Sequence, residues 1–139
     1  MEVDVNWVAV LLATASTMVV GSIWYAPAVF GNTWMKLVKL DKAKAAKNGI
    51  KPILVTVVVS FITAYILAHV SFLSNVYSAN SWLYDSLMTA FWLWLGFVAA
   101  RMITHDAFEG RPLKLTVMNV SHELVTLMVM GLIIGLLQP

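Results

Sequence analysis

The chain of 139 residues contains no cysteine and very little charge. Without cysteine it can form no disulfide, no thiolate nucleophile and no Cys-ligated metal site. Only 12% of the residues are charged and 60% are hydrophobic, a balance too apolar for an ordinary soluble domain. Walker, Rossmann, HExxH and nucleophile-elbow patterns are also missing. The composition therefore favours a membrane protein, and no pattern points to a cofactor.

Four apolar runs are long enough to cross a hydrocarbon layer, for which roughly 20 residues are needed. They cover residues 6–29, 52–73, 83–102 and 113–137, and the first two contain no charged residue. We predict a single domain: an all-α integral membrane protein whose four spans form two out-in-out hairpins. A cleavable signal peptide needs a positive start, whereas this chain opens with Glu2 and Asp4, so we expect the first run to be retained as a span.

Basic residues are missing from the amino terminus and from the second connection, residues 74–85. By the positive-inside rule, both termini and this connection face outward from a bacterial cytoplasmic (inner) membrane. This one-sided bias would make any homo-oligomer parallel. The pI near 9.0 then reflects topology and contact with lipid headgroups, so no nucleic-acid partner is expected. All nine Lys and Arg lie in or beside the other two connections: Lys36, Lys39, Lys42, Lys44, Lys47, Lys51, Arg101, Arg111 and Lys114.

The first span ends in the block SIWYAPAVFGNTWMKL, where Trp24 and Tyr25 fit an aromatic belt at the inner interface. Pro27 and Gly31 are expected to bend or end the helix. Apolar residues then recur at helical spacing opposite lysines. Two short helices are therefore expected in this connection: an amphipathic one lying flat in the interface over residues 30–38, and a surface helix over residues 41–49.

Two further tryptophans, Trp92 and Trp94, lie well inside the third predicted span. Tryptophan is normally interfacial, so two at depth indicate either buried packing, the commoner role, or the wall of a cavity. Together with Trp24 and Tyr25 they are the candidate cavity aromatics. His69, in the second span, is expected near the outer interface, where a lone histidine is usually solvated.

The last apolar run carries ionisable groups at its centre, in the stretch VMNVSHELVTLMVM. A rise of about 1.5 Å per residue puts His122 and Glu123 roughly 14 to 15 Å into the span, near the midplane of a core about 30 Å thick. Asn119, Glu123 and Thr126 share one helical face, and His122 borders it. Because ionisable groups at this depth are costly and mark functional sites, these four residues form the candidate intramembrane site.

The state of Glu123 is open at this point: neutral, paired with a protonated histidine, or bound to a cation. Adjacent helical residues point about 100° apart, so we expect its partner to come from another helix or subunit rather than from His122. Alternatively, these polar groups only fix helix packing, each contributing on the order of 1 kcal/mol or less. His122 and Glu123 lack metal-ligand spacing, so no metal site is predicted.

Two stretches, WYAPAVFGNTWMK and LGF followed by FEGRPLKLTVMNVSHELVTLMVMGLI, resemble a bacterial family of small four-helix membrane proteins, catalogued as domain of unknown function 1761. The similarity spans nearly the whole chain, and the WY-x-P-x-x-FG-x-x-W block is its more specific part. The resemblance implies the four-helix membrane architecture and no reaction. Members of the family often keep the Asn that corresponds to Asn119.

Two main functional hypotheses follow. The first is an oligomeric, proton-linked transporter or channel for a small solute, in which Glu123 carries the proton. Stripes of small residues would supply the oligomer contacts: Ala9, Ala13, Thr17 and Gly21 in the first span, and Gly131 and Gly135 in the last. The second is a non-catalytic accessory protein that binds lipid or helps a membrane complex to assemble.

An enzyme is the least favoured hypothesis. The last connection offers His105, Asp106 and Glu109 near Arg111, which could in principle bind a phosphate or a metal. Short polar turns between spans rarely do this, and solvated loop residues are the better interpretation. No catalytic residue is therefore predicted.

Overall fold

The computed structural model describes residues 3–40 and 50–139, and within these ranges the chain forms only helices and turns. Helices α5, η1 and α6 follow one another without a break and make one long rod, and η1 is a π-helical segment at its centre. Four helical rods are long and apolar enough to cross a membrane, which confirms the all-helical prediction with four apolar helices. The helix expected over residues 41–49 lies outside the described residues. The helices are α1 (Trp7–Trp24), α2 (Gly31–Leu37), α4 (Lys51–Ser78), α5 (Trp82–Leu93), η1 (Trp94–Ala99), α6 (Ala100–Phe108) and α7 (Leu113–Leu137).

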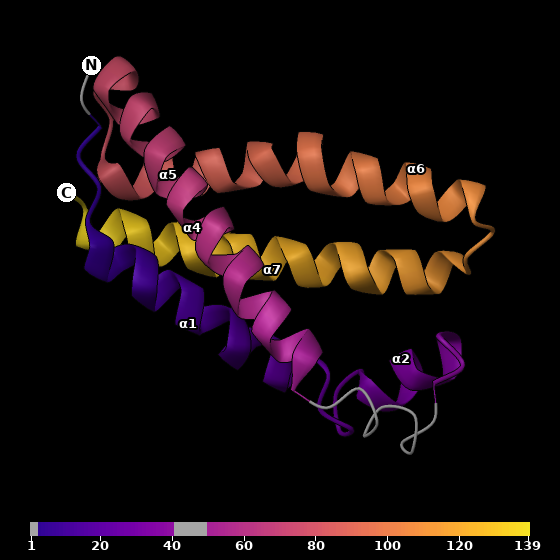
Figure 1. Cartoon of the computed structure of the whole chain (residues 1–139). Coiled ribbons are helices and arrows are strands. Elements are labelled where there is room, and N and C mark those ends of the chain that lie inside the picture. The colour runs from indigo at the N-terminus through magenta and orange to yellow at the C-terminus, as the bar shows by residue number, and fades with distance from the viewer. Residues whose placement is uncertain (1–2, 41–49) are drawn as a thin grey trace.

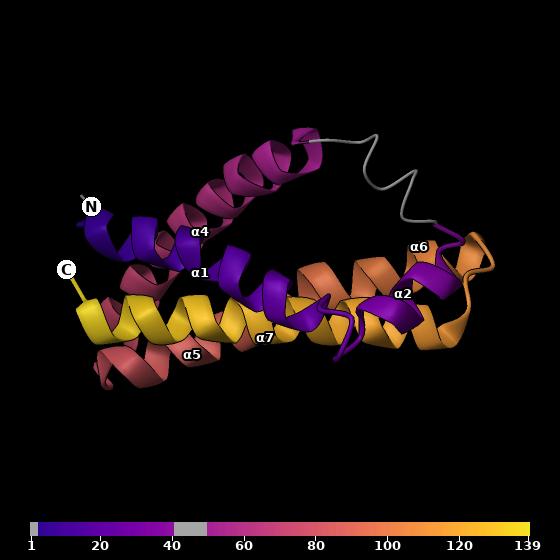
Figure 2. The ribbon, with the colours of Figure 1, turned by 90° about the horizontal axis from the view of Figure 1, so that it is seen from below.

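The four rods form a ring in which α1 and α5 each contact both α4 and α7. Helix α7 runs beside α5 and α6, whereas α4 crosses α1 and α7 at a steep angle (Figure 1). The two termini meet at one end, and α2 and the α6–α7 turn lie at the other (Figure 2). The side-chain amide of Asn6 holds the termini together, because it donates to the carbonyls of Leu137 and Gln138, each at 3.1 Å.

Small residues allow close contacts between these rods. Ala9 and Ala13 are buried in the core, where alanine lets neighbouring helices approach closely. A Cβ atom on Gly131 would lie 2.9 Å from the Ser86 carbonyl oxygen, so α7 and α5 meet backbone to backbone at this position. These parts of both small-residue stripes therefore serve packing within the chain. The buried core consists of Ala9, Val10, Ala13, Ala64, Leu67, Ala68, Ala90, Leu127, Met130 and Ile134.

The third rod ends later than the sequence indicates. The predicted span ends at residue 102, just after the charged Arg101, whereas the helix continues to Phe108. It ends where Gly110 takes a left-handed conformation with φ 64°. The Arg111 N–H then donates to the Asp106 carbonyl at 2.9 Å, and the Gly110 N–H to the Ala107 carbonyl at 3.3 Å, which is a Schellman motif. Backbone capping, rather than the first charge, sets this boundary. Helix α4 likewise continues past the predicted residue 73, to Ser78.

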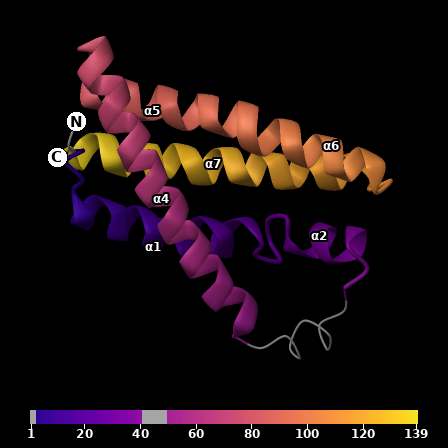
Figure 3. The same ribbon diagram turned by 45° about the horizontal axis from the view of Figure 1, so that its top comes forward.

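Helix α1 ends at Trp24, earlier than the predicted residue 29, because the chain turns back tightly there. The Phe30 N–H donates to the Trp24 carbonyl at 3.1 Å, and the Gly31 N–H to the Ala26 carbonyl at 3.0 Å. A Cβ atom on Gly31 would overlap the carbonyl oxygen of Tyr25, so only glycine fits this turn. Helix α2 then continues beyond the end of α1 (Figure 3) and contacts α7.

Candidate functional site

A groove opens between α1, α4 and α7, with a volume of about 850 Å³. It exists because α4 crosses the other two helices and its first half diverges from them (Figure 2). Every residue from Lys51 to Val59 is exposed. The volume falls in the usual range for small-molecule pockets, roughly 300–1,000 Å³. Hydroxyl groups from all three helices line the groove: Thr17 and Ser22 on α1, Thr56, Ser60 and Thr63 on α4, and Thr126 on α7.

The carboxyl group of Glu123 faces this groove from the middle of α7. Its side chain is 39% exposed, whereas that of its neighbour His122 is 14% exposed. The His122 Nδ1 atom lies 3.3 Å from Glu123 Oε1. Within the chain the contact is therefore with the adjacent residue and not, as the sequence predicts, with a group on another helix or subunit, because both side chains are long enough to meet across the angle between them. Glu123 is the only acidic residue among the described residues that line the groove, and none of those residues is Lys or Arg.

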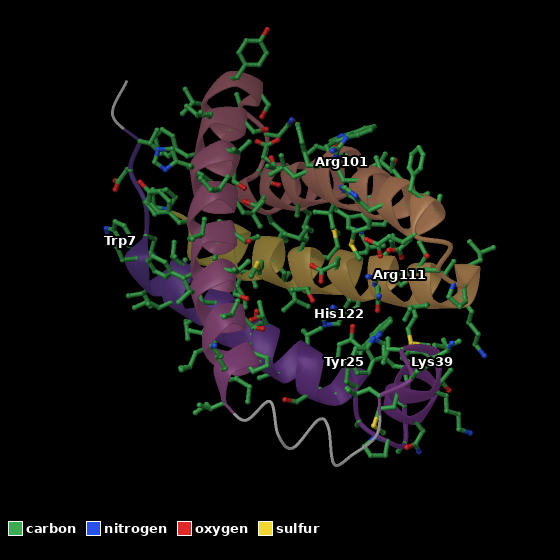
Figure 4. The ribbon with its side chains drawn as sticks, turned by 45° about the vertical axis from the view of Figure 1, so that its right-hand side comes forward. Trp7, Tyr25, Lys39, Arg101, Arg111 and His122 are labelled. Atoms are coloured by element: carbon green, nitrogen blue, oxygen red, sulfur yellow. The ribbon has the colours of Figure 1, made fainter. Side chains whose placement is uncertain are left out.

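Aromatic rings surround the imidazole of His122. The ring of Tyr25 lies 5.0 Å away, and the ring of Trp24 lies 5.8 Å away, edge-on. Tyr25 and His122 approach each other from the end of α1 and from α7 (Figure 4). Gly21 lies beside the imidazole, since a Cβ atom there would make an ordinary van der Waals contact of 3.8 Å with Nε2. Helix α1 and the turn after it therefore form the wall around His122.

The WY-x-P-x-x-FG-x-x-W block holds this wall in place. Phe30 packs against Trp24 with ring centroids 4.7 Å apart, and Trp34 packs edge-on against Tyr25 at 5.3 Å. The Tyr25 hydroxyl also lies 3.5 Å from Oδ1 of Asn119, at the limit of a hydrogen bond. This block, the most specific part of the sequence, thus packs on Asn119 and His122. Together with Glu123 and Thr126, these two residues form the polar stripe of α7.

The family model described as "Protein of unknown function (DUF1761)" matches residues 8–135, from the first turn of α1 to the last turns of α7. The chain belongs to this family. No curated protein and no solved structure matches the chain. The match includes both the block after α1 and the polar stripe of α7, so the site described above lies within the DUF1761 region.

Several polar atoms of this DUF1761 site have no hydrogen-bond partner among the described residues. They are buried: Trp24 Nε1, His122 Nε2 and Thr126 Oγ1. Buried polar atoms usually find a partner, because leaving one unpaired costs free energy. Across the groove, the Thr17 and Ser60 hydroxyls do pair, at 3.0 Å. Sequence reasoning missed this contact because the two residues belong to different helices, and only the crossing of α1 and α4 brings them together.

The two tryptophans of the third rod lie outside the groove. Trp94 begins η1 and donates its Nε1–H to the Val120 carbonyl at 2.9 Å, which ties this rod to the middle of α7. Trp92 is 59% exposed and lies on a shallow surface depression between α4 and α5. Of the four candidate aromatics, the structure therefore brings Trp24 and Tyr25 to His122, and places Trp92 and Trp94 elsewhere.

Polar residues of the last connection hold the α6–α7 turn. Asp106 is buried and accepts a hydrogen bond from the Thr116 hydroxyl at 2.7 Å. Arg111 lies 2.6 Å from Glu109 and 3.6 Å from Asp106. His105 is exposed. Thr116, Asn119 and Glu123 share one face of α7. Thr116 contacts Asp106 of α6, Asn119 lies beside Tyr25, and Glu123 faces the groove. No three His, Asp or Glu side chains converge within residues 3–40 and 50–139.

The α4–α5 turn at the opposite end carries a second buried carboxylate that the sequence did not single out. Asp85 is 3% exposed. It accepts hydrogen bonds from the Ser78 hydroxyl at 2.5 Å and from the amides of Asn75 and Asn80 at 2.9 and 3.4 Å. The Asn- and Ser-rich stretch before it was the available signal. The carboxylate oxygens of Asp85 are thus hydrogen-bonded within the turn, and we infer that Asp85 stabilises the connection between α4 and α5.

Proposed function

We propose that this chain is a proton-linked transporter or channel of a bacterial cytoplasmic membrane, in which a small solute enters the groove between α1, α4 and α7. The observation that supports the proposal most is the setting of Glu123, which opens onto a groove of about 850 Å³. A carboxylate whose only role is to hold two helices together is expected to be buried, with its oxygens accepting hydrogen bonds, as Asp85 is.

Glu123 would carry the coupled proton. Moving a carboxylate into a low-dielectric environment costs several kcal/mol unless a counter-charge or hydrogen bonds compensate it. A proton, a protonated His122 or a bound solute can each supply that compensation. Because these states compete for one carboxylate, release of the proton and binding of the solute become linked. His122, 3.3 Å away, is placed to share the proton.

The positions of α2 and the α6–α7 turn support an orientation in the membrane. Both lie at the same end of the molecule, and the two connections to which they belong are basic in sequence. The positive-inside rule assigns this end to the cytoplasm, and the termini and the α4–α5 turn to the outside. Helix α2, with Lys36 exposed, would lie at the cytoplasmic interface.

The working form would be a parallel homo-oligomer. Four helices seldom enclose a solute path, and here the groove opens sideways past the exposed first half of α4. A second copy would pack against the outer side of that apolar stretch and supply the rest of the path, while the gap between α4 and α7 stays open to lipid. The same stretch also favours the alternative, a non-catalytic accessory subunit whose α4 binds a different membrane protein. Neither role assigns an enzymatic reaction to the chain.

The experiment is proton flux in liposomes that contain the purified protein and a pH-sensitive dye. A panel of small cationic, neutral and anionic solutes is added outside, and the internal pH is followed. We expect at least one solute to drive proton movement in the parent protein, and Glu123→Gln to abolish it. The matched control is Glu109→Gln, on the exposed α6–α7 turn, which should retain the flux. If the parent moves no protons with any solute, the accessory role replaces transport.

A further inference from the structure

We propose that the groove selects amphiphilic organic cations with one positive charge, which enter it sideways from the lipid. The inference rests on the site of the proposed function and names its substrate class. Three features of the groove support it: the single acidic group, the apolar surface of the walls, and the opening.

The groove carries one acidic side chain and no permanent positive charge among its described lining residues. Glu123 is the only acid there, and none of those residues is Lys or Arg. An anion would meet this carboxylate with no Lys or Arg among the described lining residues to compensate it, whereas a cation would pair with it. At a partly buried position the Coulomb interaction with this carboxylate is less screened than in bulk water, so it discriminates ligands by the sign of their charge.

Apolar side chains make up much of the groove wall, between the hydroxyl groups that come from all three helices. The α4 wall carries Ile53, Val55 and Val59, and Met18 and Met130 add apolar surface from α1 and α7. Small metal cations need several oxygen ligands close together, and Glu123 is the only carboxylate here. A large cation with an apolar body fits better, because the body can lie on the α4 wall while the charged group reaches Glu123. The rings of Tyr25 and His122 border that end of the groove and favour a diffuse cation.

The opening of the groove faces sideways. The first half of α4 diverges from α1 and α7 (Figures 1 and 2), and its side chains from Lys51 to Val59 are exposed. In a membrane this gap between rods faces hydrocarbon rather than water. A solute that partitions into lipid can therefore reach Glu123 without crossing a polar vestibule, which again selects an amphiphile.

The test uses two ions of the same shape and opposite charge, tetraphenylphosphonium and tetraphenylborate. Equilibrium dialysis of the purified protein in neutral detergent at pH 8 measures their binding. We expect saturable binding of the phosphonium, no competition by the borate, and affinity at least about tenfold weaker in Glu123→Gln. Val55→Trp, which fills the groove from α4 without changing its charge, should also weaken binding. Glu109→Gln should bind as the parent does, and thermal unfolding confirms that each variant is folded.

Each outcome has a definite meaning. Competition by the borate, or equal phosphonium binding in Glu123→Gln and the parent, would overturn the inference. Proton flux driven only by neutral or anionic solutes, with no phosphonium binding, would overturn it and leave the proposed transport intact. Phosphonium binding that depends on Glu123 without any proton flux would support the cation site and contradict transport.

Discussion

At the scale of single residues, two glycines show how the same residue serves different needs. Gly31 packs directly on the Tyr25 carbonyl, in the turn that presents Tyr25 to His122. Gly96, in η1, has no heavy atom within 4 Å of where its Cβ would lie. Position 31 requires glycine because the backbone of the turn approaches it closely. At position 96, no contact within the described structure requires glycine.

This contrast leads to a paired prediction. Gly31→Ala should lower the free energy of unfolding by roughly 1–3 kcal/mol, because its Cβ would press on backbone that cannot move aside. Gly96→Ala should be neutral or stabilising by up to about 1 kcal/mol, since alanine favours helix over glycine. Thermal or denaturant unfolding of both variants in the same detergent measures the difference. Equal stability of the two variants would show that the turn around Gly31 is not as tight as described.

At the scale of helices, η1 connects the third rod to the polar centre of α7. A π-helical turn adds a residue to the helical repeat and often occurs at functional sites. Here it starts at Trp94, whose indole N–H reaches the carbonyl of Val120, one residue after Asn119. The third rod thus fixes the middle of α7 from the side opposite to α1, although it contributes only Val98 to the groove.

The two tryptophans of this rod make a matched pair for a second prediction. Trp94→Phe removes the donor to Val120 while keeping an aromatic ring, so unfolding should become easier by roughly 0.5–1.5 kcal/mol. Trp92→Phe changes a side chain that is 59% exposed and should change stability by less than about 0.5 kcal/mol. Unfolding followed by circular dichroism in mixed micelles compares them. A larger loss of stability in Trp92→Phe than in Trp94→Phe would contradict the role assigned to the hydrogen bond between Trp94 and Val120.

At the scale of the whole molecule, the decisive feature is the crossing of α4. Its second half packs into the ring through Ala64, Leu67 and Ala68, while its first half diverges. The termini gather at one end, and α2 and the α6–α7 turn at the other. The groove and the proposed orientation both follow from this arrangement, and the orientation can be tested without reference to any solute.

Because the chain has no cysteine, single cysteines report on sidedness directly. Tyr77, at the end of α4, and Phe108, at the end of α6, are 95% and 92% exposed and lie at opposite ends of the molecule. A membrane-impermeant maleimide applied to intact cells should label Tyr77→Cys. It should label Phe108→Cys only after the membrane is permeabilised. The reverse pattern would invert the orientation, and labelling of both would indicate that the chain inserts in two directions.

Much of the architecture could be predicted from the sequence. The bounds of the last span, residues 113–137, agree with α7, since Pro112 precedes the helix and the hydrophobic run is continuous. The family and the four apolar helices were likewise predicted. The end of the third rod was not, because hydropathy falls at Arg101 while helical capping continues to Gly110. Helix bounds depend on backbone hydrogen bonds that a hydropathy pattern does not measure.

The sequence alone determined that four apolar rods exist and that Asn119, Glu123 and Thr126 share a face of the last one, because both depend on distances along one helix. Only the tertiary structure decided what each of these residues meets. Asn119 faces Tyr25, and Glu123 and Thr126 face the groove. Tyr25 reaches Asn119 from the end of α1, and the groove depends on how α4 crosses α1 and α7. Packing between helices far apart in the sequence decides such contacts, and no single run of sequence specifies them.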